Sequence, residues 1–298
     1  MKKRIVVVAP GRGSYTKETL GYLQRHRQLA SPLISELDQW KAQLNEPTIS
    51  ELDNAKTFKA QVHTKGENAS VLIYACAMAD FLSINRDEYE VVAVTGNSMG
   101  WYIALALAEA LDNSGAFEVI NTMGSMMKEQ IIGGQIIYPL IDENWHFDSK
   151  KVQLVDQLLN RLRQSEGLSV YPSIYLGGYI VIGGDQEALS QLMKQLPPEE
   201  HFPFQLINHA AFHTPLLQTV SDKALQIFKP DGLFKKPSLP LIDGRGKIWT
   251  TYSTALDELF NYTFEHQVLK PYDFTQAIAV ALKEFAPDQV FLLGPGNT

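Results

Sequence analysis

The residues best suited to covalent chemistry lie in the segment Gly96-Asn97-Ser98-Met99-Gly100. An apolar, β-branched run at residues 91–94 precedes it, and an Ala/Leu-rich helical pattern follows it. A serine between two glycines at a sharp strand-to-helix turn is typical of a nucleophile elbow. The N-terminus of the following helix favours an anion that develops there. The pattern therefore predicts that Ser98 is a nucleophile, and the alternative is a purely structural turn.

A serine hydroxyl is a weak nucleophile until a neighbouring base accepts its proton. The chain has seven histidines. Two of them lie in polar stretches and are expected to be solvated, namely His26 and His63, and two lie in or beside a predicted insert, namely His146 and His201. Three candidates remain in loops between elements of the main domain, where sites are commonly built: His209, His213 and His266. Periodicity alone does not choose among these three.

A second glycine-rich segment is Pro10-Gly11-Arg12-Gly13-Ser14, which follows a predicted strand at residues 4–9. A phosphate-binding loop is one interpretation, but the spacing and the Lys-Ser/Thr pair of that motif are missing. The other interpretation is that the loop offers a backbone N–H to a reaction centre at the edge of a parallel sheet.

Composition narrows the class of protein. The chain has 298 residues, of which 45% are hydrophobic and 20% are charged, as is ordinary for a globular enzyme. The net charge of −7 argues against a nucleic-acid partner. No apolar run is long enough to span a membrane, and no Cys/His cluster has metal-ligand spacing. The single cysteine, Cys76, lies in an apolar helical pattern, so we expect a core residue and a cytoplasmic protein.

The remaining elements follow from apolar periodicity. Residues 16–85 are predicted to be mostly helical, with breaks at 31–32, 45–47 and 64–66. Further helices are expected at residues 68–82, 117–130, 216–228, 256–262 and 274–285. Short strands are expected at residues 239–243 and 289–293. Alternating strands and helices of this kind favour an α/β fold with a parallel sheet.

The pattern changes after Gly133-Gly134. Residues 133–207 read as strand, helix, strand, strand, helix and strand, which is the βαββαβ order of a ferredoxin-like subdomain. We therefore expect a discontinuous catalytic domain at residues 1–132 and 208–298, with the ferredoxin-like subdomain inserted at 133–207.

Several motifs together resemble those of malonyl-CoA:acyl carrier protein transacylases and of the acyltransferase domains of polyketide synthases. Residues 10–14 resemble the family's P-G-Q-G-S loop, and residues 96–100 resemble its G-H-S-x-G elbow. Residues 211–216 (AFHTPL) resemble its P-F-H-S-x-L segment, residues 267–271 (QVLKP) its Q-L-x-x-P segment, and residues 294–296 its terminal G-P-G. Their order and the insert support the resemblance over nearly the whole chain, which implies an α/β-hydrolase-like core.

The resemblance implies roles for particular residues. Ser98 would attack a thioester and carry the acyl group, with His213 as the general base and then the acid. A main-chain carbonyl at Gln267 would orient the histidine. The backbone N–H groups of Met99 and Arg12 would form the oxyanion hole. The acyl group would come from acyl-CoA and pass to the phosphopantetheine thiol of an acyl carrier protein, and no bound cofactor or metal is implied.

The departures from the family pattern concern the acyl pocket. Met123 stands where family members that use malonyl groups place an arginine, and a thioether cannot form the bidentate pair with a carboxylate. This change favours an uncarboxylated acyl group. Arg12 replaces the family's glutamine, so its guanidinium could instead hold a carboxylate from the other side. The alternative is that Arg12 points to solvent or pairs with a neighbouring Asp or Glu. Asn97 and Trp101 also replace family residues, and Phe212 completes the set of pocket candidates. The alternative for Trp101 is a packing role alone.

Three functions are compatible with these residues. The first is an acyl-CoA:acyl carrier protein S-acyltransferase that uses Ser98 and His213. The second is a hydrolase that clears acyl groups from carrier proteins, in which water resolves the acyl-enzyme. The third is a catalytically weakened homologue that only binds a carrier protein. The substitutions around the serine support this third function.

Overall fold

The structure is a computed structural model that describes residues 1–126, 128 and 131–296. The chain forms two compact units, which are described separately here. The first comprises residues 1–128, 229–260 and 276–298, and the second comprises residues 129–228 and 261–275. The two units are defined by which residues pack against one another. The domain boundaries at 133 and 207 stay a prediction.

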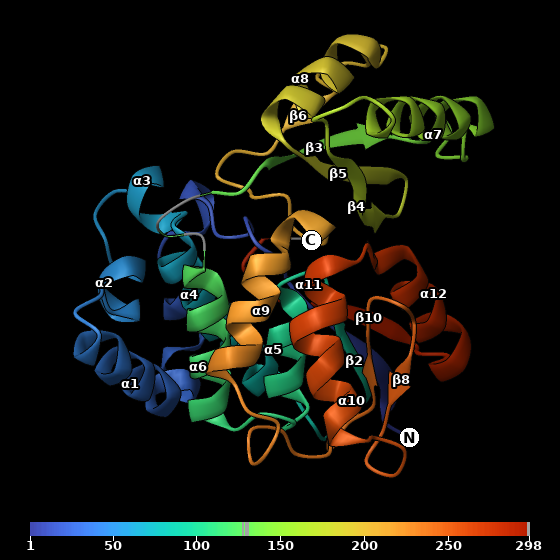
Figure 1. Cartoon of the computed structure of the whole chain (residues 1–298). Helices are drawn as coiled ribbons and strands as arrows, with labels where there is room; N and C mark the ends of the chain where they lie inside the picture. The colour runs from blue at the N-terminus through green and yellow to red at the C-terminus, as the bar shows by residue number, and fades with distance from the viewer. Residues whose placement is uncertain (127, 129–130, 297–298) are drawn as a thin grey trace. The chain divides into compact units, whose positions relative to one another are not determined.

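The first unit contains a five-stranded sheet in the order β10-β1-β2-β7-β8 (Figure 1). Its strands are β1 (Lys3–Ala9), β2 (Tyr89–Gly96), β7 (Leu241–Ile242), β8 (Ile248–Trp249) and β10 (Gln289–Leu292). β1 pairs in parallel with β10 and β2, and β2 in parallel with β7, whereas the short β8 is antiparallel. In the register, Ala9 pairs with Gly96. The chain thus leaves β1 and β2 at the same edge of the sheet, which is where α/β proteins build their sites.

The first unit also contains 3-10 and α-helices. They are η1 (Lys17–Thr19), η2 (Tyr22–His26), α1 (Arg27–Gln43), α2 (Ile49–Asp53), α3 (Ala60–His63), α4 (Gly66–Ser83), α5 (Gly100–Leu107), α6 (Asn113–Ser125), α10 (Leu256–Asn261) and α12 (Phe274–Phe285). The apolar stretches predicted to be helical at 68–82 and 274–285 are confirmed. The predicted end of a helix at Gln130 lies outside the described residues. Cys76 is buried in α4, as expected of a core residue, and burial raises its pKa.

The predicted helix break at residues 31–32 is wrong. α1 runs through Pro32, which costs one backbone hydrogen bond in the second turn. Pro32 faces solvent, where water can satisfy the freed carbonyl, and Leu33 and Leu37 on the opposite face are buried. The apolar face therefore outweighs the proline.

The second unit contains the ferredoxin-like subdomain. Its elements are β3 (Gly134–Pro139), α7 (Ser149–Arg163), β4 (Val170–Leu176), β5 (Tyr179–Gly184), α8 (Gln186–Gln195) and β6 (Phe204–Gln205). The sheet order β6-β3-β5-β4, with every one of these neighbours antiparallel, confirms the predicted βαββαβ arrangement. Figure 1 shows α7 and α8 beside these strands, and apolar residues of both helices share one buried cluster with β3 and β5.

The second unit also contains segments from later in the chain. They are η3 (Pro215–Leu217), α9 (Gln218–Ile227), a π-helical turn (Tyr262–His266), α11 (Gln267–Leu269) and β9 (Tyr272–Asp273), which extends the second sheet beside β4. The expectation that His266 lies in a loop is wrong, because helical backbone continues into α11. Three consecutive buried residues, 262–264, obscure the helical period, and the π-turn accommodates them. Among the helices of the described residues, none combines the length and the apolar character needed to cross a bilayer.

Candidate active site

Ser98 occupies the strained turn that the motif predicts. β2 ends at Gly96 and α5 begins at Gly100, and between them Ser98 has a φ of 55°. A side chain at Gly96 would place its Cβ 2.2 Å from the Gly100 carbonyl oxygen. A Cβ at Gly100 would lie 2.5 Å from the oxygen of Ala9. Both glycines are therefore required by close backbone contacts, and the strand–turn–helix geometry of an elbow is confirmed.

The loop after β1 packs directly against this elbow. The backbone N–H of Asn97 donates to the oxygen of Ala9 at 3.2 Å. A Cβ at Gly11 would lie 3.0 Å from the oxygen of Asn97. The backbone of the 10–14 loop therefore runs beside the serine turn, as the second interpretation of this loop expects. Placement of the Arg12 and Met99 N–H groups as an oxyanion hole stays a prediction.

The Arg12 side chain turns inward. It is partly buried, and its Nη1 atom lies 3.3 Å from the position that a Cβ on Gly66 would take. Gly66 is the first residue of α4, and Glu67, the second, is only 8% exposed. Burial lowers the pKa of Arg12, whereas attraction to the Glu67 carboxylate raises it. The guanidinium therefore lies at the start of α4 with a buried carboxylate close by.

Met123 lies in the last turn of α6 and is partly buried. The next residue, Gly124, is in close contact with α4, since a Cβ there would lie 2.5 Å from Ser70 Oγ and 2.6 Å from the oxygen of Gly66. Arg12 thus lies against the start of α4, and Met123 directly precedes the glycine that touches the same helix turn. Two of the predicted pocket residues are brought to the same region of the first unit.

The other two pocket candidates of the first unit are buried. Trp101 is fully buried in α5, which is the position of a packing residue. Asn97 is 9% exposed, and among the described residues its Oδ1 atom has no hydrogen-bond partner. A buried oxygen without a hydrogen bond lowers the free energy of unfolding by on the order of 1–3 kcal/mol. The elbow therefore contains an acceptor without a hydrogen bond as well as a strained backbone.

His213 lies in the second unit with a defined partner. Its Nδ1 lies 2.5 Å from the main-chain oxygen of Gln267, and the ring packs on Tyr272 with centroids 5.4 Å apart. Because a carbonyl can only accept, Nδ1 carries the proton and Nε2 is left with a lone pair. The side chain is 4% exposed, and burial lowers its pKa to about 4 although the Gln267 bond opposes the shift. His213 is therefore neutral at pH 7 and able to accept a proton.

The backbone that carries His213 is fastened to the second sheet. Ser173 Oγ donates to the oxygen of Phe212 at 2.8 Å, and Gln135 Nε2 donates to Ser173 Oγ at 2.6 Å. Thr214 Oγ1 donates to the oxygen of Ala211 at 2.6 Å, which closes the turn around a His213 φ of 58°. The half-buried Phe212 side chain lies beside His209, with ring centroids 6.1 Å apart.

The other histidines have ordinary partners or are solvated. His209 Nδ1 lies 2.9 Å from Gln135 Oε1, and His266 stacks on Tyr262. The expectation that His63 is solvated is wrong, because it is 2% exposed and both ring nitrogens meet backbone atoms of residues 52 and 59. An apolar environment formed by distant residues, including the ring of Tyr15, covers it.

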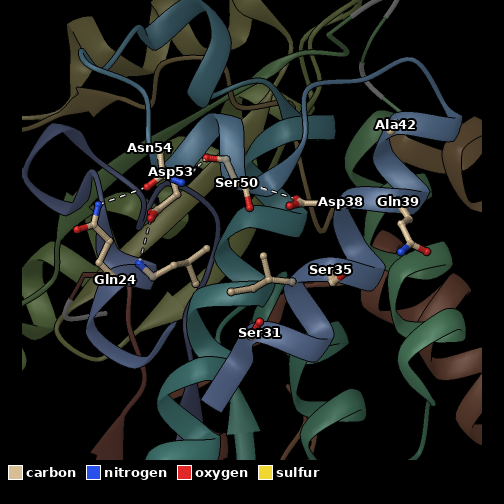
Figure 2. Close-up of a pocket in the computed structure, with 11 residues that line it drawn as sticks. Gln24, Ser31, Ser35, Asp38, Gln39, Ala42, Ser50, Asp53 and Asn54 are labelled. Carbon is tan, nitrogen blue, oxygen red and sulfur yellow. Dashed lines mark hydrogen bonds between the residues drawn. The ribbon is translucent and has the colours of Figure 1, made fainter. Parts of the chain in front are cut away.

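A cavity elsewhere in the first unit carries polar groups but none of the predicted site residues. It has a volume of about 400 Å³ and is lined by residues of η2, α1 and α2, among them Gln24, Ser31 and Ser50 (Figure 2). Asp53, on its wall, accepts from the Tyr15 hydroxyl at 2.8 Å and from the Leu23 N–H at 3.2 Å. Asp38 accepts from the Ser50 N–H at 3.0 Å, which is drawn in Figure 2. These bonds fasten the helices to one another, which is a structural role.

Sequence reasoning missed the residues that support the predicted site. Glu67 is a charged residue in the first turn of a helix whose middle, residues 71–79, is apolar, a signal that could have marked it. Ser173 and Gln135 lie within strands and give no such signal. Within the described residues, no group of three or more His, Cys, Asp or Glu side chains is placed to hold a metal ion.

The comparisons with known sequences find partial relatives. No protein-family model matches the chain. Two proteins of Dictyostelium discoideum that are named as probable polyketide synthases are 29% identical over 136 residues and 27% identical over 133 residues, which is 41% and 40% of this chain. The matches cover only 5% and 4% of those much longer proteins.

Solved structures match over almost the whole chain. A type II polyketide synthase malonyl transacylase in complex with its acyl carrier protein has a TM-score of 0.79 at 20% identity, over 99% of this chain and 90% of that one. The acyl carrier protein S-malonyltransferase of Burkholderia pseudomallei gives 0.79 at 19% identity, with the same coverage. The malonyl-CoA:acyl carrier protein transacylase of Coxiella burnetii gives 0.78 at 18% identity, over 100% and 89%. The predicted resemblance is therefore confirmed at the level of the fold, and this chain has the fold of the malonyl-CoA:acyl carrier protein transacylases.

Proposed function

We propose that this protein is an acyl-CoA:acyl carrier protein S-acyltransferase that works through an acyl-Ser98 intermediate. The observation that carries the proposal is the left-handed backbone of Ser98 at a turn whose two glycines are fixed by contact. A non-glycine residue in this region costs about 1–2 kcal/mol, and strain of this kind clusters at functional sites. Ser98 also directly precedes the N-cap of α5, and the N-terminus of a helix favours a developing anion.

In the first half-reaction, Ser98 Oγ attacks the thioester carbonyl carbon of acyl-CoA. His213 Nε2 accepts the hydroxyl proton, a role supported by its neutral state and by the bond from Nδ1 to Gln267. The tetrahedral intermediate then breaks its C–S bond, and His213 returns the proton to the departing CoA sulfur. The backbone N–H groups of Met99 and Arg12 stabilise the oxyanion.

In the second half-reaction, the phosphopantetheine thiol of an acyl carrier protein attacks acyl-Ser98 and takes the acyl group, while its proton passes through His213. The carrier as partner is supported by the transacylase of the same fold whose structure was solved with its carrier protein. The whole cycle needs no bound cofactor, and its location in the cytoplasm stays a prediction.

The intact mass of the protein after brief incubation with acetyl-, butyryl- and malonyl-CoA tests the proposal. We expect an acyl adduct on the wild-type chain, none on Ser98→Ala, and transfer of the adduct to added acyl carrier protein. An adduct that water clears as quickly without the carrier would instead indicate a hydrolase. A chain that no acyl-CoA labels would overturn the proposal in favour of a carrier-binding homologue.

A further inference from the structure

Three polar side chains of the second unit form a continuous chain of hydrogen bonds that ends beside His213. His209 Nδ1 lies 2.9 Å from Gln135 Oε1, and Gln135 Nε2 donates to Ser173 Oγ at 2.6 Å. Ser173 Oγ donates to the main-chain oxygen of Phe212 at 2.8 Å, and Gln135 Nε2 lies 3.5 Å from the same oxygen. The chain of bonds therefore ends at the carbonyl group directly before the proposed base.

The last acceptor sets the direction of these hydrogen bonds. The oxygen of Phe212 can only accept, so the Ser173 hydroxyl donates to it and its oxygen accepts from the Gln135 amide. The Gln135 carbonyl oxygen accepts in turn, so Nδ1 of His209 carries a proton. All three donors point the same way, and hydrogen bonds aligned in this manner strengthen one another.

The second sheet brings the two inner members together. Gln135 lies in β3 and Ser173 in β4, and Gly183 of the intervening β5 pairs with Gln135 in the register. A Cβ on Gly183 would lie 2.8 Å from Thr214 Cγ2, so the missing side chain lets the turn around His213 lie close to the sheet. Gln135 is 1% exposed and Ser173 is fully buried, so water does not compete for their bonds.

His209 occupies the outer end of the chain of bonds and is partly exposed. A water molecule can donate to the Gln135 oxygen in its place, and such a bond is nearly as favourable as a direct one. The two buried members, Gln135 and Ser173, therefore carry the effect on the turn.

The Phe212 carbonyl controls the backbone of His213. The φ angle of a residue is the rotation about its N–Cα bond relative to the carbonyl carbon before it. His213 has a φ of 58°, which non-glycine residues rarely adopt, so the surrounding bonds must hold it. Ser173 holds the carbonyl side of this rotation, and the oxygen of Gln267 holds the ring. The residue is thus fixed at its backbone and at its imidazole.

We propose that Gln135 and Ser173 are positioning residues, which hold the His213 imidazole in the orientation that proton transfer requires. This inference rests on the acyltransferase function proposed above, in which His213 is the base. Both residues act through the Phe212 carbonyl and exchange no proton with the substrate. Without their bonds the left-handed turn would relax and move the imidazole, and a displacement of about 1 Å can lower a rate by on the order of 10²-fold.

The test measures the single-turnover rate constant of Ser98 acylation by whichever of acetyl-, butyryl- and malonyl-CoA labels the wild-type chain. A loss of folded protein lowers the amount of adduct and leaves this rate constant unchanged. Ser173→Ala removes the donor to the Phe212 oxygen, so the maximal rate constant should fall by about tenfold or more. The half-saturating acyl-CoA concentration should stay within about twofold, because substrate binding is not affected.

Tyr138→Phe is the matched control. Tyr138 is a fully buried residue of β3, and its hydroxyl donates to the main-chain oxygen of Pro197 at 3.0 Å. The variant therefore also loses a hydroxyl that donates to a main-chain oxygen, but at a distance from the His213 turn in the sequence. Its maximal rate constant should stay within about twofold of the wild-type value.

Gln135→Glu tests the direction of the bonds. The new carboxylate has nearly the size of the amide but can only accept, so the Ser173 hydroxyl would turn to it and leave the Phe212 oxygen. The maximal rate constant should therefore fall about as far as in Ser173→Ala. Ser173→Thr keeps a hydroxyl and should retain more of the rate than Ser173→Ala.

A measurement on the wild-type chain needs no variant to be active. ¹⁵N NMR of labelled histidine at about pH 8, where a solvated imidazole is neutral, should show His209 protonated at Nδ1. The signals are assigned by their loss in His209→Asn. A His209 protonated only at Nε2 would reverse the bonds and overturn the inference.

The inference is also overturned if folded Ser173→Ala or folded Gln135→Glu keeps the wild-type rate constant, or if Tyr138→Phe loses as much as they do. Failure of the proposed function gives a different result. In that case no acyl-CoA labels the wild-type chain, or His213→Asn acylates as fast as the wild-type chain.

Discussion

The main-chain oxygen of Gln267 holds the Nδ1 proton of His213 across 2.5 Å, within a site where the imidazole is 4% exposed. The acceptor is a carbonyl dipole and not a carboxylate. It fixes the tautomer but brings no full negative charge to stabilise an imidazolium. Burial therefore dominates, and the pKa of His213 falls to about 4.

The first prediction concerns pH. Because the folded pKa of His213 is about 4, the base should stay deprotonated at pH 5.5, where an ordinary histidine is about 90% protonated. The rate of Ser98 acylation should therefore keep most of its value down to about pH 5 and fall near pH 4. Rapid-quench mass measurements across pH 3.5–8 would check it, and an acid limb near pH 6.5 would contradict it.

The same shift affects stability. The unfolded chain binds a proton at this residue below about pH 6.5, whereas the folded chain binds it only near pH 4. The contribution of His213 to the free energy of unfolding is thus complete above pH 6.5 and is lost as pH falls from 6.5 towards 4. His213→Asn should show a shallower loss of stability over that window in urea denaturation.

The second prediction separates the candidate bases. His213→Asn should lower the acylation rate by about 10²-fold or more, the usual contribution of a general base. His209→Asn is the matched control, because His209 meets the side chain of Gln135 and is not assigned a proton-transfer role. The acylation rate of the His209→Asn variant should stay within about threefold of the wild-type rate. The reverse result would transfer the base role to His209.

The third prediction concerns the contact of α4 with α6. Gly124→Ala would place a methyl group 2.5 Å from Ser70 Oγ, so the helices must separate and the free energy of unfolding should fall by about 1–3 kcal/mol. Gly115→Ala, in the same helix, meets its nearest atom at 3.4 Å and should not destabilise. Thermal unfolding of both variants measures the difference. Equal melting temperatures would contradict the prediction, because they would show that α4 and α6 accommodate the added methyl group without loss of stability.

The fourth prediction concerns the buried cation. Lys41→Met leaves Glu46 and the oxygen of Glu67 without their bonds from Nζ, so the free energy of unfolding should fall by about 3 kcal/mol. Lys235→Met breaks an ion pair with Asp112 in which both side chains are 62% exposed, and should cost at most about 1 kcal/mol. Urea denaturation of the two variants compares them, and equal losses would contradict a special role for Lys41.

Local sequence predicted the elements whose signal is local. The elbow at Ser98 and the βαββαβ order of the second sheet depend on short-range patterns of glycines and apolar residues, and the structure has both. The partnership of His213 with Gln267 was expected only through resemblance, because 54 residues separate the two and no periodicity connects them.

The features that the sequence did not predict depend on packing between segments that lie apart in the chain. His63 is buried only because Tyr15, Leu52 and Phe58 converge on it. Pro32 stays helical only because a buried face opposite it holds α1 in place. Arg12 comes close to Gly66 because the loop after β1 approaches the start of α4, and no pattern within either segment predicts that approach.

Because Ser98 has a left-handed backbone, the residue that would be most stable at this position differs from the residue that activity requires. Glycine adopts a φ of 55° without steric cost, so Ser98→Gly should fold at least as well as the wild-type chain while losing every acyl adduct. A library at position 98 screened only for heat resistance should therefore enrich glycine and asparagine. A library screened for acyl transfer should return serine alone or with cysteine, so the two screens would diverge at this residue.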